Sequence, residues 1–289
     1  MIYRKLGKTD LELSLIGYGG WQLGEHGWGK WDINSAAKLL EICYENGINF
    51  YDTAPIYGFG KSEERIGEIF KGAREKIVIA TKFGLVWNDT KWISHDLSRS
   101  SILREVELSL KRLKTDYIDI YQVHWLDSKT PLEELFETLN YLKKNGVIKH
   151  IGVCNFDIKN LEKSLKFSEI VSIQNQYNML QTEVEKNILP FCKENNISFI
   201  PYSPLAQGLL TGGIDENFKL SKKDARKFNP LFNDKIKFSD SINFVKKLKK
   251  PVSKTALDYL IKREEVVSVI VGSRKVEHLL ENLKVLENY

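Results

Sequence analysis

The sequence predicts an α/β protein, a (β/α)8 TIM barrel with an N-terminal β-hairpin closing the bottom. Eight short apolar runs alternate with helical patterns along the chain, as the repeated strand–helix units of such a barrel require. No Pro/Ser-rich linker or change of composition divides the 289 residues. We therefore expect one domain over 1-289, close to the roughly 250 residues typical of the fold. A doubly wound open sheet is the topological alternative.

The hairpin is the first expected element. Two short alternating segments, 2–6 and 11–15, flank the turn-forming sequence Gly7-Lys8-Thr9-Asp10. The barrel strands are expected where apolar and β-branched residues run together. Their predicted ranges are 15–18, 49–52, 77–82, 118–124, 150–153, 171–174, 198–202 and 267–271.

Apolar residues at helical spacing separate these strands. The first helix contains Ala36, Leu40 and Cys43 and should end near Gly47, a residue that suits a helix C-terminus. Later helices are expected near 103–113, 158–168, 186–196, 252–264 and 276–287.

The helix after the fourth strand carries the clearest start signal. Thr130 can cap this helix, Pro131 fits its first turn, and Glu133 can complete a capping box. Gly146 should end it. The apolar positions expected to face inward are Leu132, Leu135, Phe136, Leu139 and Leu142.

The stretch 204–250 has no regular pattern and is too long for an ordinary loop, which indicates a functional segment. Its Lys-rich part, 219–250, also contains Asp224, Asp234 and Asp240. We interpret this part as a solvated loop. A mobile flap that contacts an anion is the functional alternative.

Composition argues against several classes of protein. The net charge of +5 is modest, whereas nucleic-acid binding usually needs a concentrated basic face. No apolar run approaches the ~18 residues of a membrane span, and 1–5 starts no signal peptide. Three scattered cysteines lack metal-ligand spacing, which indicates reduced thiols in a cytoplasmic protein. We expect a monomer or a weak homo-oligomer.

Four chemically active side chains lie at, or just beyond, the C-terminal ends of predicted strands, where a barrel carries its active site. Asp52 follows the second strand, with Tyr57 in the loop beyond, while Lys82 and His124 follow the third and fourth strands. A cation near a phenol lowers the pKa of tyrosine from its ordinary value of about 10. Such a tyrosine can exchange a proton with a carbonyl or alkoxide oxygen, which indicates an enzyme.

The segments around these residues resemble the aldo-keto reductase family, and the resemblance covers essentially the whole chain. Asp52-Thr53-Ala54-Pro55-Ile56-Tyr57-Gly58 is similar to the signature around that family's acid/base tyrosine. Thr81-Lys82 and Val123-His124-Trp125 are similar to its other two signatures. The resemblance implies a catalytic tetrad of Asp52, Tyr57, Lys82 and His124.

The resemblance also implies a nicotinamide cofactor, NADP(H). Asn155 and Gln176 match ligands of the carboxamide, Cys154 stands where the family commonly has a serine, and Tyr202 matches the ring that stacks on nicotinamide. Ordinary barrel structure is the alternative for such residues. The other expected cofactor contacts are Gly20, Trp21, Asp52, Ser203, Pro204, Leu205, Gln207, Gly208, Gly272, Ser273, Arg274, His278, Glu281 and Asn282.

The implied reaction is hydride transfer between the cofactor and a small carbonyl or alcohol substrate. Tyr57 would give the proton, and neutral His124 would donate a hydrogen bond to the carbonyl oxygen. Lys82 would bias Tyr57 toward phenolate, and Asp52 would hold Lys82. Trp21, Trp87 and Trp125 are expected to line the substrate pocket together with Tyr57 and His124, with core packing as the alternative for each tryptophan.

Two other functions stay open. Some members of the same family, such as the β subunits of potassium channels, are regulatory partners that bind the nicotinamide cofactor. A barrel lyase or isomerase would instead bind no nicotinamide cofactor at all. A turnover assay with NADPH separates these alternatives.

Overall fold

Eight parallel strands form a ring in the computed structural model, which describes residues 1–289 except for the side chain of Asn288. The strands pair in the order β11-β10-β9-β8-β5-β4-β3-β12. Their bounds are β3 Ile16–Gly19, β4 Phe50–Asp52, β5 Val78–Phe83, β8 Ile118–Val123, β9 Ile148–Cys154, β10 Ser172–Gln176, β11 Ser198–Tyr202 and β12 Val269–Val271.

Hydrogen bonds beside β11 and β12 close the ring. The Phe199 amide donates to the Glu265 carbonyl over 2.7 Å, and the Val267 amide donates to the Phe199 carbonyl over 3.1 Å. An open doubly wound sheet has two free edges, so the closure excludes it. The prediction of a TIM barrel is confirmed.

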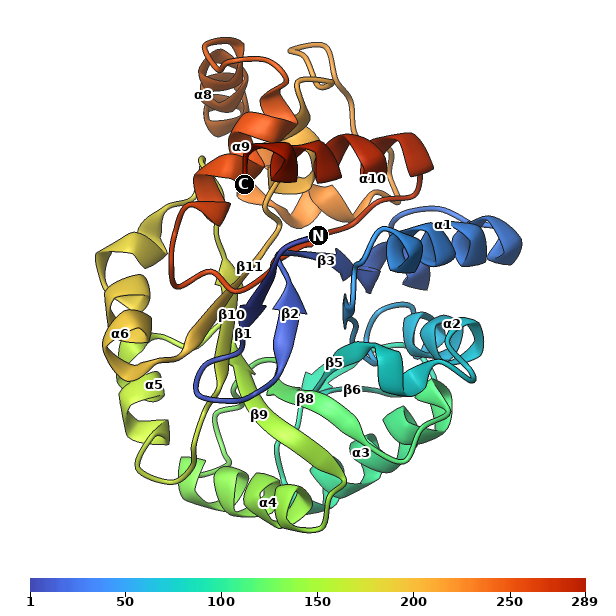
Figure 1. The fold of residues 1–289 in the computed structure, drawn as a ribbon, viewed down its shortest axis with the longest axis vertical. Coiled ribbons are helices and arrows are strands. Elements are labelled where there is room, and N and C mark those ends of the chain that lie inside the picture. Colours follow the sequence, from blue (N-terminus) through green and yellow to red (C-terminus); the bar gives the residue numbers. More distant parts are fainter.

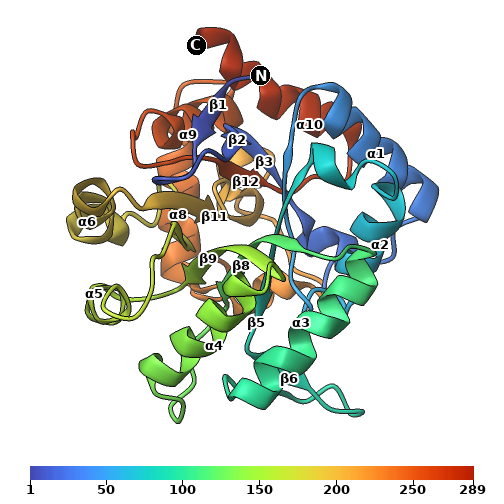
Figure 2. The same ribbon diagram turned by 60° about the horizontal axis from the view of Figure 1, so that its bottom comes forward.

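Helices surround the strands in both ribbon views (Figures 1 and 2). The α-helices of this layer are α1 Ile33–Glu45, α2 Lys61–Ile69, α3 Arg99–Leu113, α4 Leu132–Lys144, α5 Ile158–Ser164, α6 Ile188–Asn195, α9 Val252–Ile261 and α10 Val276–Leu283. Short 3₁₀ helices lie at η1 Gly20–Gly24, η2 Arg74–Lys76, η3 Glu183–Lys186 and η6 Lys284–Asn288. None of the helices in the described part of the chain is long and apolar enough to cross a membrane.

Short polar side chains begin several of these helices, since a side-chain oxygen can accept from a free amide of the first turn. Asp32 accepts from the Ser35 amide over 2.8 Å at α1. The expected cap at α4 is wrong. Thr130 instead donates its hydroxyl to Asp127 over 2.8 Å, and α4 begins at Leu132 after Pro131.

The N-terminal hairpin, β1 Tyr3–Lys5 and β2 Glu12–Ser14, closes the bottom of the barrel as predicted. Leu6 and Leu13 are fully buried and pack against inward residues of the strands, among them Phe50 and Ile120. The guanidinium of Arg4 donates to the carbonyls of Ile261, Arg263 and Val266 over 2.6–3.0 Å. These contacts leave the opposite, C-terminal end of the strands for a functional site.

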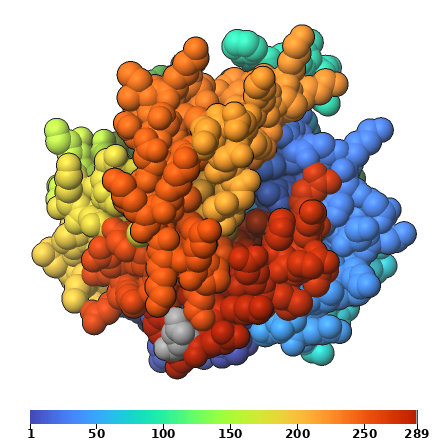
Figure 3. All heavy atoms as spheres, turned by 90° about the horizontal axis from the view of Figure 1, so that it is seen from above, coloured from blue at the N-terminus to red at the C-terminus, as the bar shows by residue number. Residues whose placement is uncertain are grey.

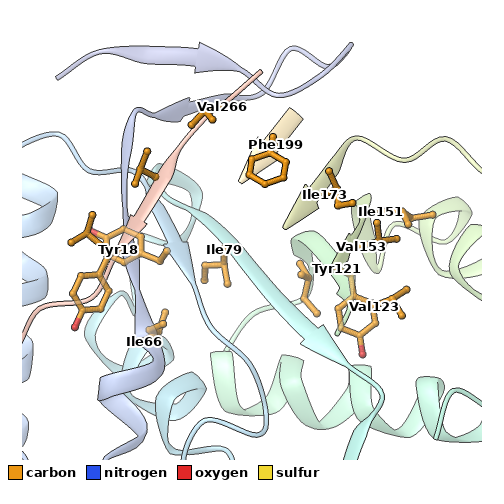
Figure 4. Close-up of a cluster of buried hydrophobic side chains, with 14 of the residues drawn as sticks. Tyr18, Ile66, Ile79, Tyr121, Val123, Ile151, Val153, Ile173, Phe199 and Val266 are labelled. Atoms are coloured by element: carbon orange, nitrogen blue, oxygen red, sulfur yellow. The ribbon is translucent and has the colours of Figure 1, made fainter. Parts of the chain in front are cut away.

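Strand side chains alternate between two buried clusters, because successive residues of a strand point to opposite faces. Ile79, Tyr121, Ile151 and Ile173 lie in the cluster between strands and helices (Figure 4). The residues between them along each strand point into the barrel. The inward residues of the lower barrel include Phe50, Val78, Ala80, Ile120 and Ile200.

The interpretation of 219–250 as a solvated loop is wrong. The stretch 204–250 contains η4 Ala206–Thr211, η5 Ala225–Phe228, α7 Pro230–Asn233 and α8 Lys235–Lys246. Leu209, Leu231, Ile242 and Val245 are buried in a separate apolar cluster there, and this burial holds the segment in a defined conformation. Viewed from above, its orange atoms lie beside both blue N-terminal and red C-terminal residues (Figure 3). The anion-contacting flap stays a prediction.

Candidate active site

A buried ion pair lies at the C-terminal ends of β4 and β5. The Lys82 ammonium donates to the two carboxylate oxygens of Asp52 over 2.7 and 2.9 Å and to the Thr53 carbonyl over 2.9 Å. Lys82 is fully buried and Asp52 is 3% exposed. An unpaired ammonium at this depth would be costly, so the carboxylate allows the lysine to stay charged.

The phenol of Tyr57 completes this arrangement. Its hydroxyl lies 3.3 Å from the Lys82 ammonium, in the loop that follows β4. Tyr57 is half-buried, and this burial raises its pKa to about 12, although Lys82 acts to lower it. The expectation of a pKa below the ordinary tyrosine value is therefore wrong, because loss of hydration outweighs the cation. The phenol stays protonated at neutral pH and can act as a proton donor.

His124 lies beside Tyr57, immediately after β8. The two rings meet edge to face with centroids 6.1 Å apart. Burial, and then the nearby charge of Lys82, hold the pKa of His124 well below its ordinary value. The imidazole is therefore neutral at neutral pH and can donate one hydrogen bond to a bound oxygen. The four predicted residues thus meet at one place.

The ends of β9, β10 and β11 bring further predicted residues to this place. The Asn155 side chain donates to the His124 carbonyl over 3.1 Å and accepts from the Tyr202 hydroxyl over 2.9 Å. Cys154 is buried, and burial raises the pKa of its thiol. Gln176 ends β10 and is half-buried. Asn155 and Tyr202 therefore form a linked polar edge beside the tetrad.

The chain after β11 has an unusual backbone. Ser203, Ala206, Gln207 and Gly208 have positive φ values of 52°, 46°, 54° and 107°, and Pro204 and Leu205 lie between them. Within this turn the Ala206 amide donates to the Ser203 carbonyl and the Gly208 amide donates to the Leu205 carbonyl, each over 2.9 Å. The 203–208 segment is therefore a tight turn held by its own backbone hydrogen bonds, and its contact with phosphate stays a prediction.

Several of the predicted adenosine contacts after β12 already bond to other groups of the chain. Arg274 donates to the carbonyls of Trp28 and Lys30 and lies over the Trp31 ring, 5.3 Å from its centroid. The Ser273 hydroxyl donates to the Lys275 carbonyl over 2.8 Å. On α10, His278 is exposed and Asn282 is buried, while Glu281 accepts from Ser253 over 3.0 Å. Gly272 is exposed at the start of this segment.

Tryptophans flank the loop that carries Tyr57. Trp21 lies 6.2 Å from the Tyr57 ring and 5.1 Å from Trp28, measured between centroids. It follows the buried Gly20, whose carbonyl accepts from Ser62. Trp87 packs against Phe59 at 5.5 Å and belongs to a hairpin of β6 Leu85–Trp87 and β7 Ile93–His95. Trp125 is 41% exposed. Thus Trp87 and Trp125 lie outside the closed core.

Comparison with known proteins places this geometry in a family. The family model described as the aldo/keto reductase family matches residues 15–288. The chain belongs to the aldo/keto reductase family. The prediction made from the three signature segments is confirmed.

Several named aldo/keto reductases and related enzymes are similar to this chain. Aldo-keto reductase YhdN of Bacillus subtilis is 39% identical over 252 residues, which cover 86% of this chain and 76% of the relative. The NADH-specific methylglyoxal reductase of Escherichia coli is 34% identical, with coverages of 97% and 92%. The solved glycerol dehydrogenase AKR11B4 of Gluconobacter oxydans superposes with a TM-score of 0.88 at 31% identity, covering 98% and 89% of the two chains.

Sequence reasoning missed a close backbone contact that positions the tyrosine loop of this aldo/keto reductase. A Cβ on Gly24 would lie 2.4 Å from the Tyr57 carbonyl carbon, and one on Gly58 would lie 2.1 Å from the Gly24 oxygen. Gly58 also has a φ of +69°. Only glycine allows this approach without displacing Tyr57. The glycines were visible in the sequence, but the contact between distant loops was not.

Two glutamines that were also missed reach the buried carboxylate. Gln174 donates to Asp52 over 2.8 Å, and Gln122 donates to the same oxygen over 3.3 Å. Gln174 lies two residues before the predicted Gln176, and Gln122 two residues before His124. The alternation of side chains along a strand was the signal that could have found them, because residues two positions apart point to the same face.

Proposed function

We propose that the protein catalyses the reversible, NADPH-dependent reduction of aldehydes and ketones to alcohols, with Tyr57 as general acid/base. One observation carries the proposal. The Tyr57 hydroxyl lies 3.3 Å from an ammonium that is itself paired with a buried carboxylate, next to a neutral imidazole. This set can hold a carbonyl oxygen and give it a proton.

The residues at the strand ends fit a nicotinamide dinucleotide. Asn155, Gln176 and Tyr202 offer amide and aromatic contacts beside the tetrad, and the turn 203–208 directly follows β11, where the pyrophosphate would bind. When bound, the cofactor supplies the hydride. The remaining chemistry falls to the chain, since Tyr57 provides the proton and His124 a hydrogen bond to the oxygen that becomes negative.

Lys82 and Asp52 support Tyr57 rather than touch the substrate in this proposal. Lys82 lowers the proton affinity that burial gives to Tyr57, and Asp52 keeps Lys82 charged. Trp21, Trp87 and Trp125 would contact the non-reacting part of the substrate.

We further propose that the protein acts in the cytoplasm, since Cys43, Cys154 and Cys192 are free and buried. We propose a monomer or a weak homo-oligomer as its state of assembly.

A carbonyl panel with purified protein tests the proposed function. The panel should combine aliphatic and aromatic aldehydes with methylglyoxal, and should include glycerol for the reverse direction, because similar proteins are named for the last two compounds. We expect oxidation of NADPH with at least one carbonyl. Cofactor binding without turnover on any compound would favour a regulatory subunit, and absence of cofactor binding would contradict the proposal.

The preference for NADP(H) rests on Arg274, near Lys275 and Lys30. The Arg274 guanidinium now donates to two carbonyls, but a 2′-phosphate would offer it stronger, charge-assisted hydrogen bonds. Such bonds are worth about 1.5–3 kcal/mol apiece, which corresponds to roughly ten- to a hundredfold in affinity. Arg274→Ala should therefore weaken NADPH binding by about this factor and leave NADH binding nearly unchanged.

Fluorescence titration of both cofactors measures this preference. Arg99→Ala is a matched control. Arg99 is an exposed residue of the outer helix α3, and its guanidinium lies over the ring of Tyr141 on α4. Equal wild-type dissociation constants for NADPH and NADH, unaltered by Arg274→Ala, would overturn the NADP(H) assignment. The naming of the Escherichia coli relative as NADH-specific makes this measurement necessary.

A further inference from the structure

Asp52 receives more hydrogen bonds than its pairing with Lys82 requires. Its Oδ1 atom accepts from the Lys82 ammonium over 2.9 Å, from Gln174 over 2.8 Å and from Gln122 over 3.3 Å. Gln122 is fully buried and Gln174 is 2% exposed. Burying two amide side chains is unfavourable unless each finds a partner, and the common partner here is one carboxylate oxygen.

The strand pattern explains how the two amides reach this oxygen. Gln122 lies on β8 two residues after the inward Ile120, and Gln174 lies on β10 next to the outward Ile173. Both glutamines therefore point into the barrel, at the height where Asp52 and Lys82 point inward from β4 and β5. The Oε1 atom of Gln122 has no hydrogen-bond partner among the described atoms. The bond from its Nε2 atom to Asp52 is therefore the hydrogen bond that this buried side chain makes.

These bonds act on the charge that Tyr57 experiences. Lys82 favours the ionised form of Tyr57 and Asp52 opposes it. Amide donors stabilise the carboxylate and draw its negative charge toward themselves. The two amide bonds therefore leave the influence of Lys82 on Tyr57 less opposed by Asp52.

We propose that Gln174, assisted by Gln122, is a positioning residue that sets how readily Tyr57 releases its proton by donating to the Oδ1 atom of Asp52. Gln174 makes the shorter bond and has the larger effect. Neither glutamine touches the substrate. The inference rests on the proposed function, because the ionisation of Tyr57 matters only if Tyr57 exchanges a proton with substrate.

The test is the ionised fraction of Tyr57, measured by NMR from the ¹³Cζ shift of labelled tyrosine and assigned by comparison with Tyr57→Phe. Gln174→Leu leaves an uncharged side chain of similar size but removes the donor. At a fixed alkaline pH below the midpoint, we expect the ionised fraction to fall about three- to tenfold, equivalent to a midpoint higher by roughly half to one pH unit. Gln122→Leu should give a smaller fall.

Ser172→Ala is the matched control. Ser172 lies on β10, two residues before Gln174 on the same inward face, and its buried hydroxyl has no partner among the described atoms. We expect no change in the ionised fraction of Tyr57 in this variant. If Gln174→Leu does not fold, Gln122→Leu carries the test with the same direction of change.

An unchanged ionised fraction in both glutamine variants would overturn the inference, even if activity fell, because a purely structural role predicts lost activity without a shifted titration. The NMR readout does not depend on turnover. Failure of the proposed function would appear separately, as full activity in Tyr57→Phe.

Discussion

Replacing Tyr57 by phenylalanine should lower carbonyl reduction by about 10²–10⁴-fold, the usual contribution of a general acid. The ring and its contacts with Trp21 and His124 remain, so cofactor binding should change little. The hydroxyl beside Lys82 is lost, and with it the proton that the reduced oxygen must receive. Single-turnover kinetics with saturating NADPH measure the loss in the chemical step itself.

Tyr51→Phe is the matched control for this experiment. Tyr51 precedes Asp52, is fully buried and donates its hydroxyl to the Ile48 carbonyl over 3.2 Å, on the outer side of the strand ring. Its loss should cost about 1 kcal/mol of stability and leave turnover near that of wild type. If Tyr57→Phe retained turnover within about threefold of wild type, Tyr57 could not be the proton donor.

The pH dependence gives a second readout of the same variant. A pKa of about 12 keeps Tyr57 protonated at neutral pH, so ionisation of this group should not limit reduction there. Alcohol oxidation needs the phenolate. At pH values below the pKa, the phenolate population rises about tenfold for each unit by which the pH increases. Oxidation should therefore accelerate with pH in the wild type, and Tyr57→Phe should remove that acceleration.

Local patterns in the sequence were sufficient for the barrel and the positions of its reactive groups. Apolar runs fixed each strand to within a few residues, for example 77–82 predicted and Val78–Phe83 observed. The carboxyl ends of parallel strands share one end of a barrel, so Asp52, Lys82 and His124 were expected to meet. This expectation needed no knowledge of long-range contacts beyond strand order.

Other features depended on contacts that sequence order does not show. The sign of the pKa shift of Tyr57 follows from its partial burial in the folded chain, which cannot be judged from a neighbouring lysine alone. Arg274 bonds to carbonyls of a loop more than two hundred positions earlier in the chain. The segment 204–250 lacks regular spacing yet buries Leu231 and Ile242, because its short helices each contribute only a few apolar residues.

Replacing Lys82 by methionine should damage both stability and activity. The variant leaves Asp52 buried without its cation, and removing one partner of a buried ion pair typically costs about 3–5 kcal/mol. Tyr57 also loses the charge that opposes burial, so its pKa should rise further and oxidation should fall by about 10²-fold or more. Denaturant unfolding and the pH dependence of oxidation measure the two effects.

The contribution of charged Lys82 to the stability of the wild type should not depend on pH near neutrality. Burial alone would lower the pKa of Lys82, but Asp52 and Tyr57 raise it above the ordinary lysine value. A group whose pKa is raised on folding contributes its full stabilisation below its unfolded pKa of about 10.4 and loses it only as pH rises through the higher folded value. Titration of Lys82 should therefore add no pH dependence to the stability of the wild type between neutral and mildly alkaline pH.

A double variant separates the two roles of Lys82. Lys82→Met combined with Asp52→Asn removes both charges, so most of the lost stability should return, because the cost of the single variant lies in the unpaired carboxylate. Activity should not return, since Tyr57 still lacks a neighbouring cation. Recovery of activity together with stability would show that Lys82 acts only by neutralising Asp52, and an oxidation pH profile unchanged in Lys82→Met would contradict its coupling to Tyr57.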